Sequence, residues 1–153
     1  MLLIFIIVSV TLITLLFGIL HDPATKYKKI KIAFRDKRKK VLVVDDDPEI
    51  LNIVKNILIT HDFDVKTHAT GLNVPEIVTD FNPNVVLLDI RLPGKSGTQV
   101  CKELKENDNS LPVIFFSARA EQEKSFASCK ANDFIQKPFN VSNLINTVKF
   151  YAN

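Results

Sequence analysis

Cysteine and histidine are too scarce in this 153-residue sequence to build the common disulfide and metal scaffolds. The two cysteines, Cys101 and Cys129, have no CxxC spacing and no neighbouring histidine, so neither a disulfide framework nor a zinc site is indicated. We expect both to be buried thiols in a reducing cytosol. The three histidines lack the spacing of metal ligands.

A phosphate-binding loop is also missing. Gly94-Lys95-Ser96 resembles the end of such a loop, but Asp89 stands where the motif requires its first glycine. Three aspartates at 45–47 directly follow the apolar run 41–44. Their negative charges would also repel the phosphate of a nucleotide or flavin. These features argue against a nucleotide or flavin site.

Charge is absent from residues 1–20, which are mainly Leu, Ile, Val and Phe. Twenty helical residues rise about 30 Å, the thickness of a bilayer core, so we expect one transmembrane helix over 1–20. A cleaved signal peptide is the main alternative, but a basic start and a small-x-small cleavage site are missing. A start-site error could also have added this leader to a soluble protein, although no methionine follows Met1 as an alternative start.

Residues 21–40 form a basic juxtamembrane linker in this interpretation, with nine Lys or Arg in 26–40. Such a cluster keeps its side of a membrane span in the cytoplasm, which predicts a single-pass protein with a cytoplasmic domain. The run could be a solvated spacer, or it could contact anionic lipids, since aromatic and aliphatic residues are interleaved in it. Nucleic acid is not an expected partner, because the run is tethered at the bilayer and residues 41–153 are acidic.

Residues 41–153 alternate strand and helix signals, which predicts an α/β domain of five strand-helix units. Three runs are continuously apolar, as central parallel strands are, whereas one run alternates with polar residues and one is short, as edge strands are. The central runs are 41–44, 85–88 and 113–116, and the edge runs are 63–69 and 134–136. The pattern fits a doubly wound, flavodoxin-like parallel sheet of order 2-1-3-4-5.

Helical stripes follow four of these runs. The clearest begins after Asp47 and Pro48, which suit the N-cap and first position of a helix. Others are expected after Pro75, Gly97 and Asn140, and a short helix is expected over 121–130. Asn140 suits the N-cap of the last helix.

Polar residues end the apolar runs at the predicted carboxyl edge of the sheet. They are Asp45 and Asp46, then Asp89, Ser117 and Lys137. Ligands bind at this edge in open α/β sheets. Clustered carboxylates suit Mg²⁺, and the remaining groups suit phosphoryl transfer to a carboxylate, with a lysine and a hydroxyl as partners of the phosphoryl oxygens. Each residue alone could be an ordinary turn residue, but the combination is harder to explain that way.

Residues 41–153 resemble the receiver domain of two-component response regulators. The matching segments are Val41–Pro48, Leu88–Gly97, Ser117-Ala118 and Asn132–Phe139. The resemblance implies that Asp89 is phosphorylated by a phosphohistidine donor, either a sensor histidine kinase or a histidine phosphotransfer protein. It implies a phosphoacceptor rather than an enzyme.

The same resemblance assigns roles to further residues. Mg²⁺ would be held by Asp46, Asp89 and the backbone carbonyl of Arg91, and by Asp45 through water. Ser117 and Phe134 would form the switch pair, and Lys137-Pro138 would be a cis peptide bond.

Two departures from the family pattern affect the expected output. The stretch between Ser117 and Phe134 is shorter than usual, so the fourth helix of the domain is expected to be short or irregular. Arg91 and Arg119 each lie two residues past a site residue, where they would tune the lifetime of the acyl phosphate or simply be solvated.

We therefore expect a membrane-tethered, single-domain response regulator whose output is a protein contact or onward phosphotransfer. The alternative is a phosphate-independent interaction module on the same fold, against which the intact Asp46, Asp89, Ser117 and Lys137 argue. The cognate kinase, the stimulus and the downstream target stay open.

Overall fold

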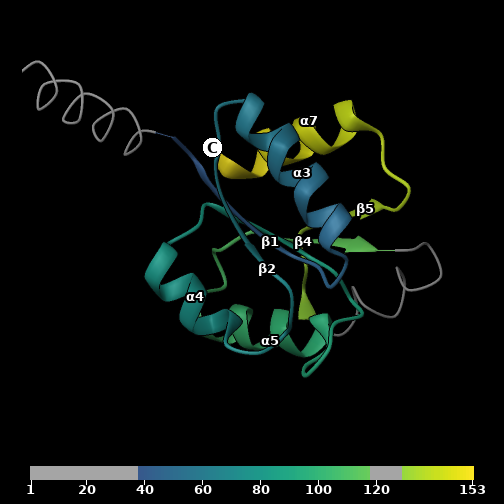
Figure 1. The fold of residues 1–153 in the computed structure, drawn as a ribbon. Helices are drawn as coiled ribbons and strands as arrows, with labels where there is room; N and C mark the ends of the chain where they lie inside the picture. The colour runs from purple at the N-terminus through teal and green to yellow at the C-terminus, as the bar shows by residue number, and fades with distance from the viewer. Residues whose placement is uncertain (1–37, 118–128) are drawn as a thin grey trace, which may run out of the picture. The chain divides into compact units, whose positions relative to one another are not determined.

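A computed structural model describes residues 38–117 and 129–153 (Figure 1). The chain divides into two units, Met1–Arg38 and Lys39–Asn153, and the second contains the whole sheet. No helix within 38–117 or 129–153 is long and apolar enough to cross a membrane. The expected span 1–20 and nearly all of the expected linker 21–40 lie outside these ranges.

All five strands are parallel, in the order β2-β1-β3-β4-β5, which confirms the predicted sheet. The strands are β1 (Lys40–Val44), β2 (Asp64–His68), β3 (Val85–Leu88), β4 (Val113–Ser117) and β5 (Asp133–Gln136). The continuously apolar runs form the three central strands, whose residues are nearly all buried. The alternating run forms the half-buried edge strand β2, as expected of a strand with one neighbour.

Within the described ranges, helices cover both faces of the sheet (Figure 1). They are α3 (Pro48–Thr60), α4 (Val74–Phe81), α5 (Gly97–Asn107) and α7 (Val141–Ala152). Successive side chains of a strand point to opposite faces, so the core has two layers. One layer packs under α3 and α7, and the other packs under α4 and α5.

Side-chain caps fix where α3, α5 and α7 start. The Asp47 carboxylate accepts hydrogen bonds from two backbone amides of the first turn of α3, and Asn140 does the same for α7. Both caps were predicted from the sequence. Ser96 caps α5 in a reciprocal capping box with Gln99. The described part of the predicted helix 121–130 is limited to its last two residues.

The prediction of two free thiols is wrong, because Cys101 and Cys129 form a disulfide. Cys101 lies on the buried side of α5, and both residues belong to the core layer under α4 and α5. Their Cα atoms are 5.8 Å apart although 28 positions separate them in sequence. Only the packing of α5 against the chain that leads into β5 creates this pairing, so no local spacing signal could have indicated it.

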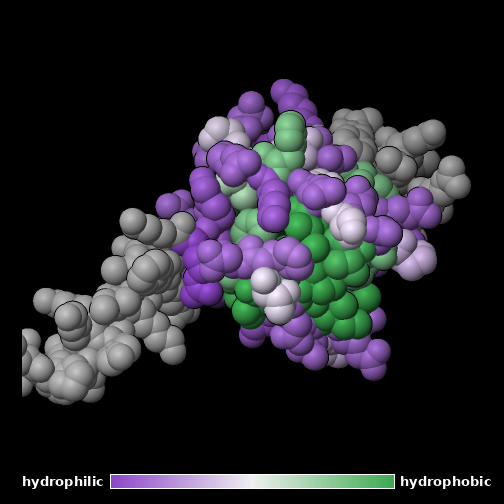
Figure 2. Space-filling model, turned by 90° about the horizontal axis from the view of Figure 1, so that it is seen from above, coloured by the Kyte–Doolittle hydropathy of each residue, from purple (hydrophilic) through white to green (hydrophobic). Residues whose placement is uncertain are grey.

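The face formed by α3 and α7 exposes hydrophobic side chains. Figure 2 shows a hydrophobic area on the molecule seen from this side. The large exposed hydrophobic residues of the two helices are Ile53 and Ile59 of α3 and Val141 and Phe150 of α7. An exposed apolar area of this kind is typical of a surface that contacts other proteins.

Candidate functional site

The residues predicted to bind the metal, accept the phosphoryl group or contact its oxygens lie at the carboxyl edge of the sheet, within the described ranges. Asp45 and Asp46 follow β1, Asp89 follows β3, Ser117 ends β4, and Lys137 follows β5. Backbone hydrogen bonds hold these strand ends in register. The Asp89 amide donates to the Val44 carbonyl at 2.8 Å, and the Lys137 amide donates to the Ser117 carbonyl at 2.9 Å.

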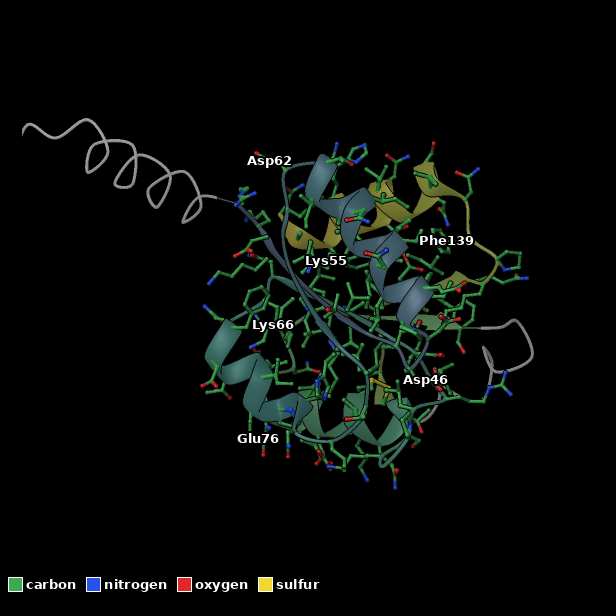
Figure 3. The ribbon with its side chains drawn as sticks, viewed as in Figure 1. Asp46, Lys55, Asp62, Lys66, Glu76 and Phe139 are labelled. Carbon is green, nitrogen blue, oxygen red and sulfur yellow. A yellow bond between two sulfur atoms is a disulfide. The ribbon has the colours of Figure 1, made fainter. Side chains whose placement is uncertain are left out.

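Three carboxylates meet at this edge. One oxygen from each of Asp45, Asp46 and Asp89 lies within 4.8 Å of the other two. Asp45 is fully buried and Asp89 is 7% exposed, whereas Asp46 faces solvent (Figure 3). Oxygen donors alone, in a partly hydrated cluster, are the ligand set that Mg²⁺ prefers. The donors present therefore fit a magnesium ion.

Burial changes the acidity of one of these carboxyl groups. Loss of solvent raises the pKa of Asp45 above its ordinary value of 3.8, and the nearby charge of Asp89 raises it further. Hydrogen bonds from Lys137 and from the Asp47 amide act in the opposite direction, but burial is the larger effect. Without another cation, the ionised form of Asp45 is thus held in the folded domain at a cost in free energy.

Lys137 contacts the acidic cluster through its ammonium group. Its Nζ atom lies 2.5 Å from Asp45 Oδ2 and 3.1 Å from Asp89 Oδ2, and it stands 4.9 Å from the centre of the Phe116 ring. The three carboxylates, when ionised, and this ammonium together carry two net negative charges. A divalent cation would balance them.

Asp89 is held by its own loop as well as by Lys137. Its Oδ1 atom accepts hydrogen bonds from the Ile90 amide at 2.6 Å and the Arg91 amide at 3.4 Å. Its Oδ2 atom contacts Lys137. The carboxylate therefore has a fixed orientation at the end of β3, beside the other two acids.

Gly97 packs against the backbone of the Asp89 loop, a role that was not predicted from the sequence. Its amide donates to the Ile90 carbonyl at 2.8 Å, and a Cβ atom built on it would lie 1.9 Å from the Asp89 carbonyl oxygen. Only glycine allows the first residue of α5 to pack directly on the backbone of Asp89. The one available signal is a poor helix former at the first position of a helix.

The predicted switch residues lie on neighbouring strands. Ser117 is buried at the end of β4, and Phe134 is half-buried in β5, opposite Phe115 in the parallel register. Phe134 packs against the core layer under α4 and α5. Ser117 is two positions beyond Phe115 on the same strand, so both side chains belong to this side of the sheet.

Of the two arginines expected to modulate the site, one can be placed. Arg91 is exposed in the loop that follows Asp89, and its amide contacts the Asp89 carboxylate. Arg119 lies outside the described residues. The Lys137-Pro138 peptide bond is cis, as predicted.

Residues 41–149 match the family model of the response regulator receiver domain. The chain belongs to this family. It is 35% identical over 113 residues to the nisin biosynthesis regulatory protein NisR of Lactococcus lactis subsp. lactis, covering 72% of this chain and 48% of NisR. The receiver chain thus spans about half the length of the curated relatives it matches.

Solved receiver structures share its fold. The receiver domain of NtrX from Brucella abortus matches with a TM-score of 0.68 and 30% identity, covering 73% of this chain and 97% of that domain. The BeF3-activated N-terminal receiver domain of RstA from Klebsiella pneumoniae matches with a TM-score of 0.70 and 28% identity, covering 75% and 99%. The receiver family acts in two-component signalling as a non-catalytic phosphoacceptor fold, and its members bind Mg²⁺ at an acidic pocket.

Proposed function

We propose that Asp89 accepts a phosphoryl group from a phosphohistidine in a Mg²⁺-dependent reaction of a two-component phosphorelay. The observation that carries this proposal is the arrangement around the Asp89 carboxylate. The Lys137 ammonium contacts Asp89 Oδ2. One oxygen each of Asp45, Asp46 and Asp89 lie within 4.8 Å of one another. A carboxylate between a metal site and an ammonium is placed to attack an anionic phosphoryl group.

Each residue has a distinct part in the proposed reaction. An oxygen of Asp89 attacks phosphorus while the phosphorus–nitrogen bond to the donor histidine breaks, which leaves an acyl phosphate on Asp89. Lys137 neutralises charge on the phosphoryl oxygens, and the Ser117 hydroxyl donates a hydrogen bond to one of them. Mg²⁺, when bound, supplies the remaining positive charge.

The proposed metal ligands come from two loops. They are the carboxylates of Asp46 and Asp89 with the backbone carbonyl of Arg91, and Asp45 through a water molecule. The clustering of the three carboxylates supports this assignment, and a divalent cation there would favour the ionised form of Asp45 that burial disfavours.

Phosphorylation is proposed to act through Ser117 and Phe134. The phosphoryl group draws the Ser117 hydroxyl toward Asp89, and Phe134 then moves within the core layer it shares with Phe115. The protein would thereby shift between two populations with different surfaces near β5. The buried position of Ser117 supports this route, since a small movement there must be accommodated by neighbouring side chains.

The decisive experiment is intact-mass analysis of the full chain after incubation with Mg²⁺ and acetyl phosphate. We expect one phosphoryl adduct that requires Mg²⁺ and is absent from Asp89→Asn. Asp80→Asn, a change of an exposed aspartate on α4, is the matched control and should keep the adduct. A folded protein that gains no adduct from acetyl phosphate or from a histidine kinase would favour the phosphate-independent interaction module.

The proposed phosphoryl donor is a sensor histidine kinase or a histidine phosphotransfer protein. The exposed hydrophobic side chains of α3 and α7 support a protein partner, because they offer apolar area for contact (Figure 2). Transfer of radiolabelled phosphate from a purified kinase to the chain, with Asp89→Asn as control, tests this donor class.

We also propose that the domain is tethered to the cytoplasmic membrane through residues 1–20. The uncharged composition of this segment and the basic run at 26–40 support the tether. Fractionation of cells that express the full chain tests it. Recovery in the membrane fraction after a high-salt wash is expected, and recovery in the soluble fraction would contradict the tether.

A further inference from the structure

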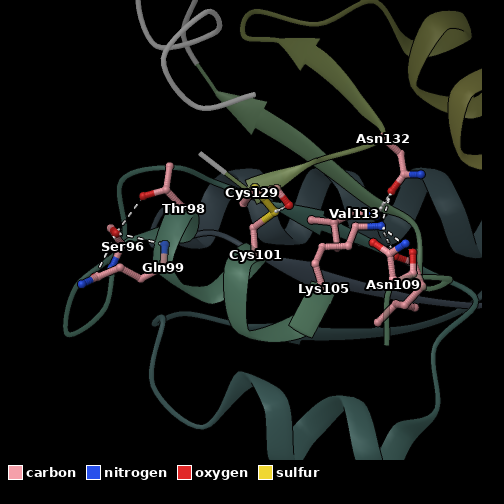
Figure 4. Close-up of a disulfide and its surroundings, with 10 residues drawn as sticks. Ser96, Thr98, Gln99, Cys101, Lys105, Asn109, Val113, Cys129 and Asn132 are labelled. Atoms are coloured by element: carbon pink, nitrogen blue, oxygen red, sulfur yellow. Dashed lines mark hydrogen bonds between the residues drawn. A yellow bond between two sulfur atoms is a disulfide. The ribbon is translucent and has the colours of Figure 1, made fainter. Parts of the chain in front are cut away.

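The disulfide connects two parts of the chain that lead to different sides of the candidate site (Figure 4). Cys101 lies in α5, the helix that begins next to Asp89. Cys129 lies shortly before β5, the strand that carries Phe134 and continues into Lys137. The covalent bond therefore joins the helix after the phosphoacceptor loop to the strand with the switch residue.

The connection from Cys101 to the site is short and tightly packed. Gly97 starts α5 one turn before Cys101, and no space remains between Gly97 and the Asp89 carbonyl oxygen. The Gly97 amide also donates to the Ile90 carbonyl at 2.8 Å. A displacement of α5 is thus transmitted to the backbone of Asp89 by direct contact.

The connection from Cys129 to β5 is also direct. Lys130 has a positive φ of 61°, and the following Ala131 packs in the same core layer as Cys129. The Asn132 amide donates to the Val113 carbonyl at 2.8 Å, which starts the pairing of β5 with β4. Holding Cys129 in place therefore helps to hold the first residues of β5.

A second contact joins the same two parts without a covalent bond. Lys105, one turn after Cys101 on α5, donates from Nζ to Asn132 Oδ1 at 2.7 Å and to the Leu111 carbonyl at 2.8 Å (Figure 4). Asn132 Oδ1 also accepts the Val113 amide at 3.0 Å. Because these bonds do not depend on the sulfur atoms, the domain keeps α5 and β5 together when the disulfide is reduced.

We propose that Cys101 and Cys129 form a reversible dithiol–disulfide centre, a redox modification site that tightens β5 against α5 when oxidised. Its regulatory meaning rests on the proposed function, since β5 carries the proposed switch residue Phe134. In the oxidised state the switch strand is held by the disulfide and by Lys105. In the reduced state the Lys105 hydrogen bond remains while the covalent link to α5 is lost, so β5, still paired with β4, has greater freedom to move.

The oxidant in this proposal is a low-molecular-weight disulfide of the glutathione class. Cys129 is 6% exposed and Cys101 is fully buried, so the Cys129 thiolate attacks first. A mixed disulfide forms, and the released thiolate takes up the proton that Cys129 lost. The Cys101 thiolate then attacks the Cys129 sulfur of the mixed disulfide, which forms the Cys101–Cys129 bond, breaks the mixed disulfide and expels a second small thiolate that takes up the proton lost by Cys101. One small disulfide thus becomes two thiols while two protein thiols become one disulfide.

The first test measures the reversibility of the bond in the full wild-type chain. The protein is equilibrated with defined ratios of oxidised to reduced glutathione and quenched in denaturant with N-ethylmaleimide. Its intact mass then gives the number of N-ethylmaleimide adducts. We expect no adducts under oxidising ratios and two adducts under reducing ratios. Two free thiols at every ratio, or a bond that survives excess reduced glutathione, would overturn the reversible centre.

The second test measures hydrogen exchange of the backbone amides in both redox states. We expect amides of residues 130–137 to exchange at least threefold faster in the reduced chain, while those of β1 are unchanged. Cys101→Ser/Cys129→Ser should exchange like reduced wild type with or without reductant. Equal exchange at 130–137 in both states would overturn the link to β5. Neither test uses phosphate, so a failure of Asp89 phosphorylation leaves both results interpretable.

Discussion

Lys137 donates a hydrogen bond to Asp45 across 92 positions of sequence, with 2.5 Å between Nζ and Oδ2. The lysine follows the edge strand β5, and the aspartate follows β1, with strands β3 and β4 between them in the sheet. The lysine side chain thus extends along the carboxyl edge of the sheet, and its ammonium also donates a hydrogen bond to Asp89. We therefore expect substitution of either residue to change the stability of the domain.

Lys137→Ala should destabilise the folded domain in the absence of Mg²⁺. The substitution leaves the buried Asp45 carboxylate without its cation, and removing one partner of such a pair costs about 3 kcal/mol. Urea unfolding in EDTA measures the loss, and saturating Mg²⁺ should reduce it because a second cation is then present. Lys149→Ala, which changes an exposed lysine of α7, should leave the free energy of unfolding unchanged. Equal losses with and without Mg²⁺ would contradict the shared role of the two cations.

Asp45→Asn should have the opposite effect at neutral pH without metal. Burial raises the pKa of Asp45 above 3.8, so wild type loses stability as pH rises from 3.8 through the folded-state pKa. Asparagine carries no charge, so the variant should be more stable than wild type at pH 7, and this gain should vanish below pH 3.8. Urea unfolding at several pH values in EDTA checks the trend. A variant less stable than wild type at pH 7 would show that the ion pair outweighs the burial cost.

Gly97→Ala should displace the backbone of Asp89 or of α5. The added methyl group would lie 1.9 Å from the Asp89 carbonyl oxygen, so the backbone of the loop or of α5 must shift. We expect a loss of about 2 kcal/mol in the free energy of unfolding, a typical cost of overpacking, and slower formation of the phosphoryl adduct. Lys102→Ala, on the exposed side of the same helix, is the control for both measurements. Wild-type behaviour of Gly97→Ala would show that the contact is not required.

Reduction of the disulfide should lower the thermal stability of the domain. The bond closes a loop between residues separated by 28 positions, and a loop of this size restricts the unfolded chain by about 3 kcal/mol. Calorimetry of the full chain with and without reductant measures the difference. Cys101→Ser/Cys129→Ser should not respond to reductant, and a response in that variant would assign the effect to another cause.

Arg91→Ala and Arg119→Ala test whether the two arginines protect the acyl phosphate. If their side chains crowd the phosphoryl group, their removal should shorten the half-life of the Asp89 adduct roughly threefold, equivalent to about 0.6 kcal/mol in the barrier. The decay of the adduct after removal of acetyl phosphate measures this. An unchanged half-life in both variants would identify them as solvated residues.

The sequence by itself determined the sheet, the edge where the polar residues gather and the caps of α3 and α7. These features depend on local patterns. An apolar run predicts a central strand, an alternating run predicts an edge strand, and Asp or Asn before a helical stripe predicts a cap. Because the carboxyl ends of parallel strands lie at one edge of the sheet, the residues that follow the apolar runs can be predicted to lie close together before any contact is known.

The tertiary structure alone decided which of these residues touch and which other residues support them. Lys137 contacts both Asp45 and Asp89, Gly97 packs on the Asp89 backbone, and Cys101 pairs with Cys129. Each of these contacts forms because two packed elements lie at a particular distance from each other. That distance depends on how closely a helix packs on the sheet and on the register of the strands. Periodicity in sequence carries no record of those distances, so the disulfide and the glycine contact became visible only in the fold.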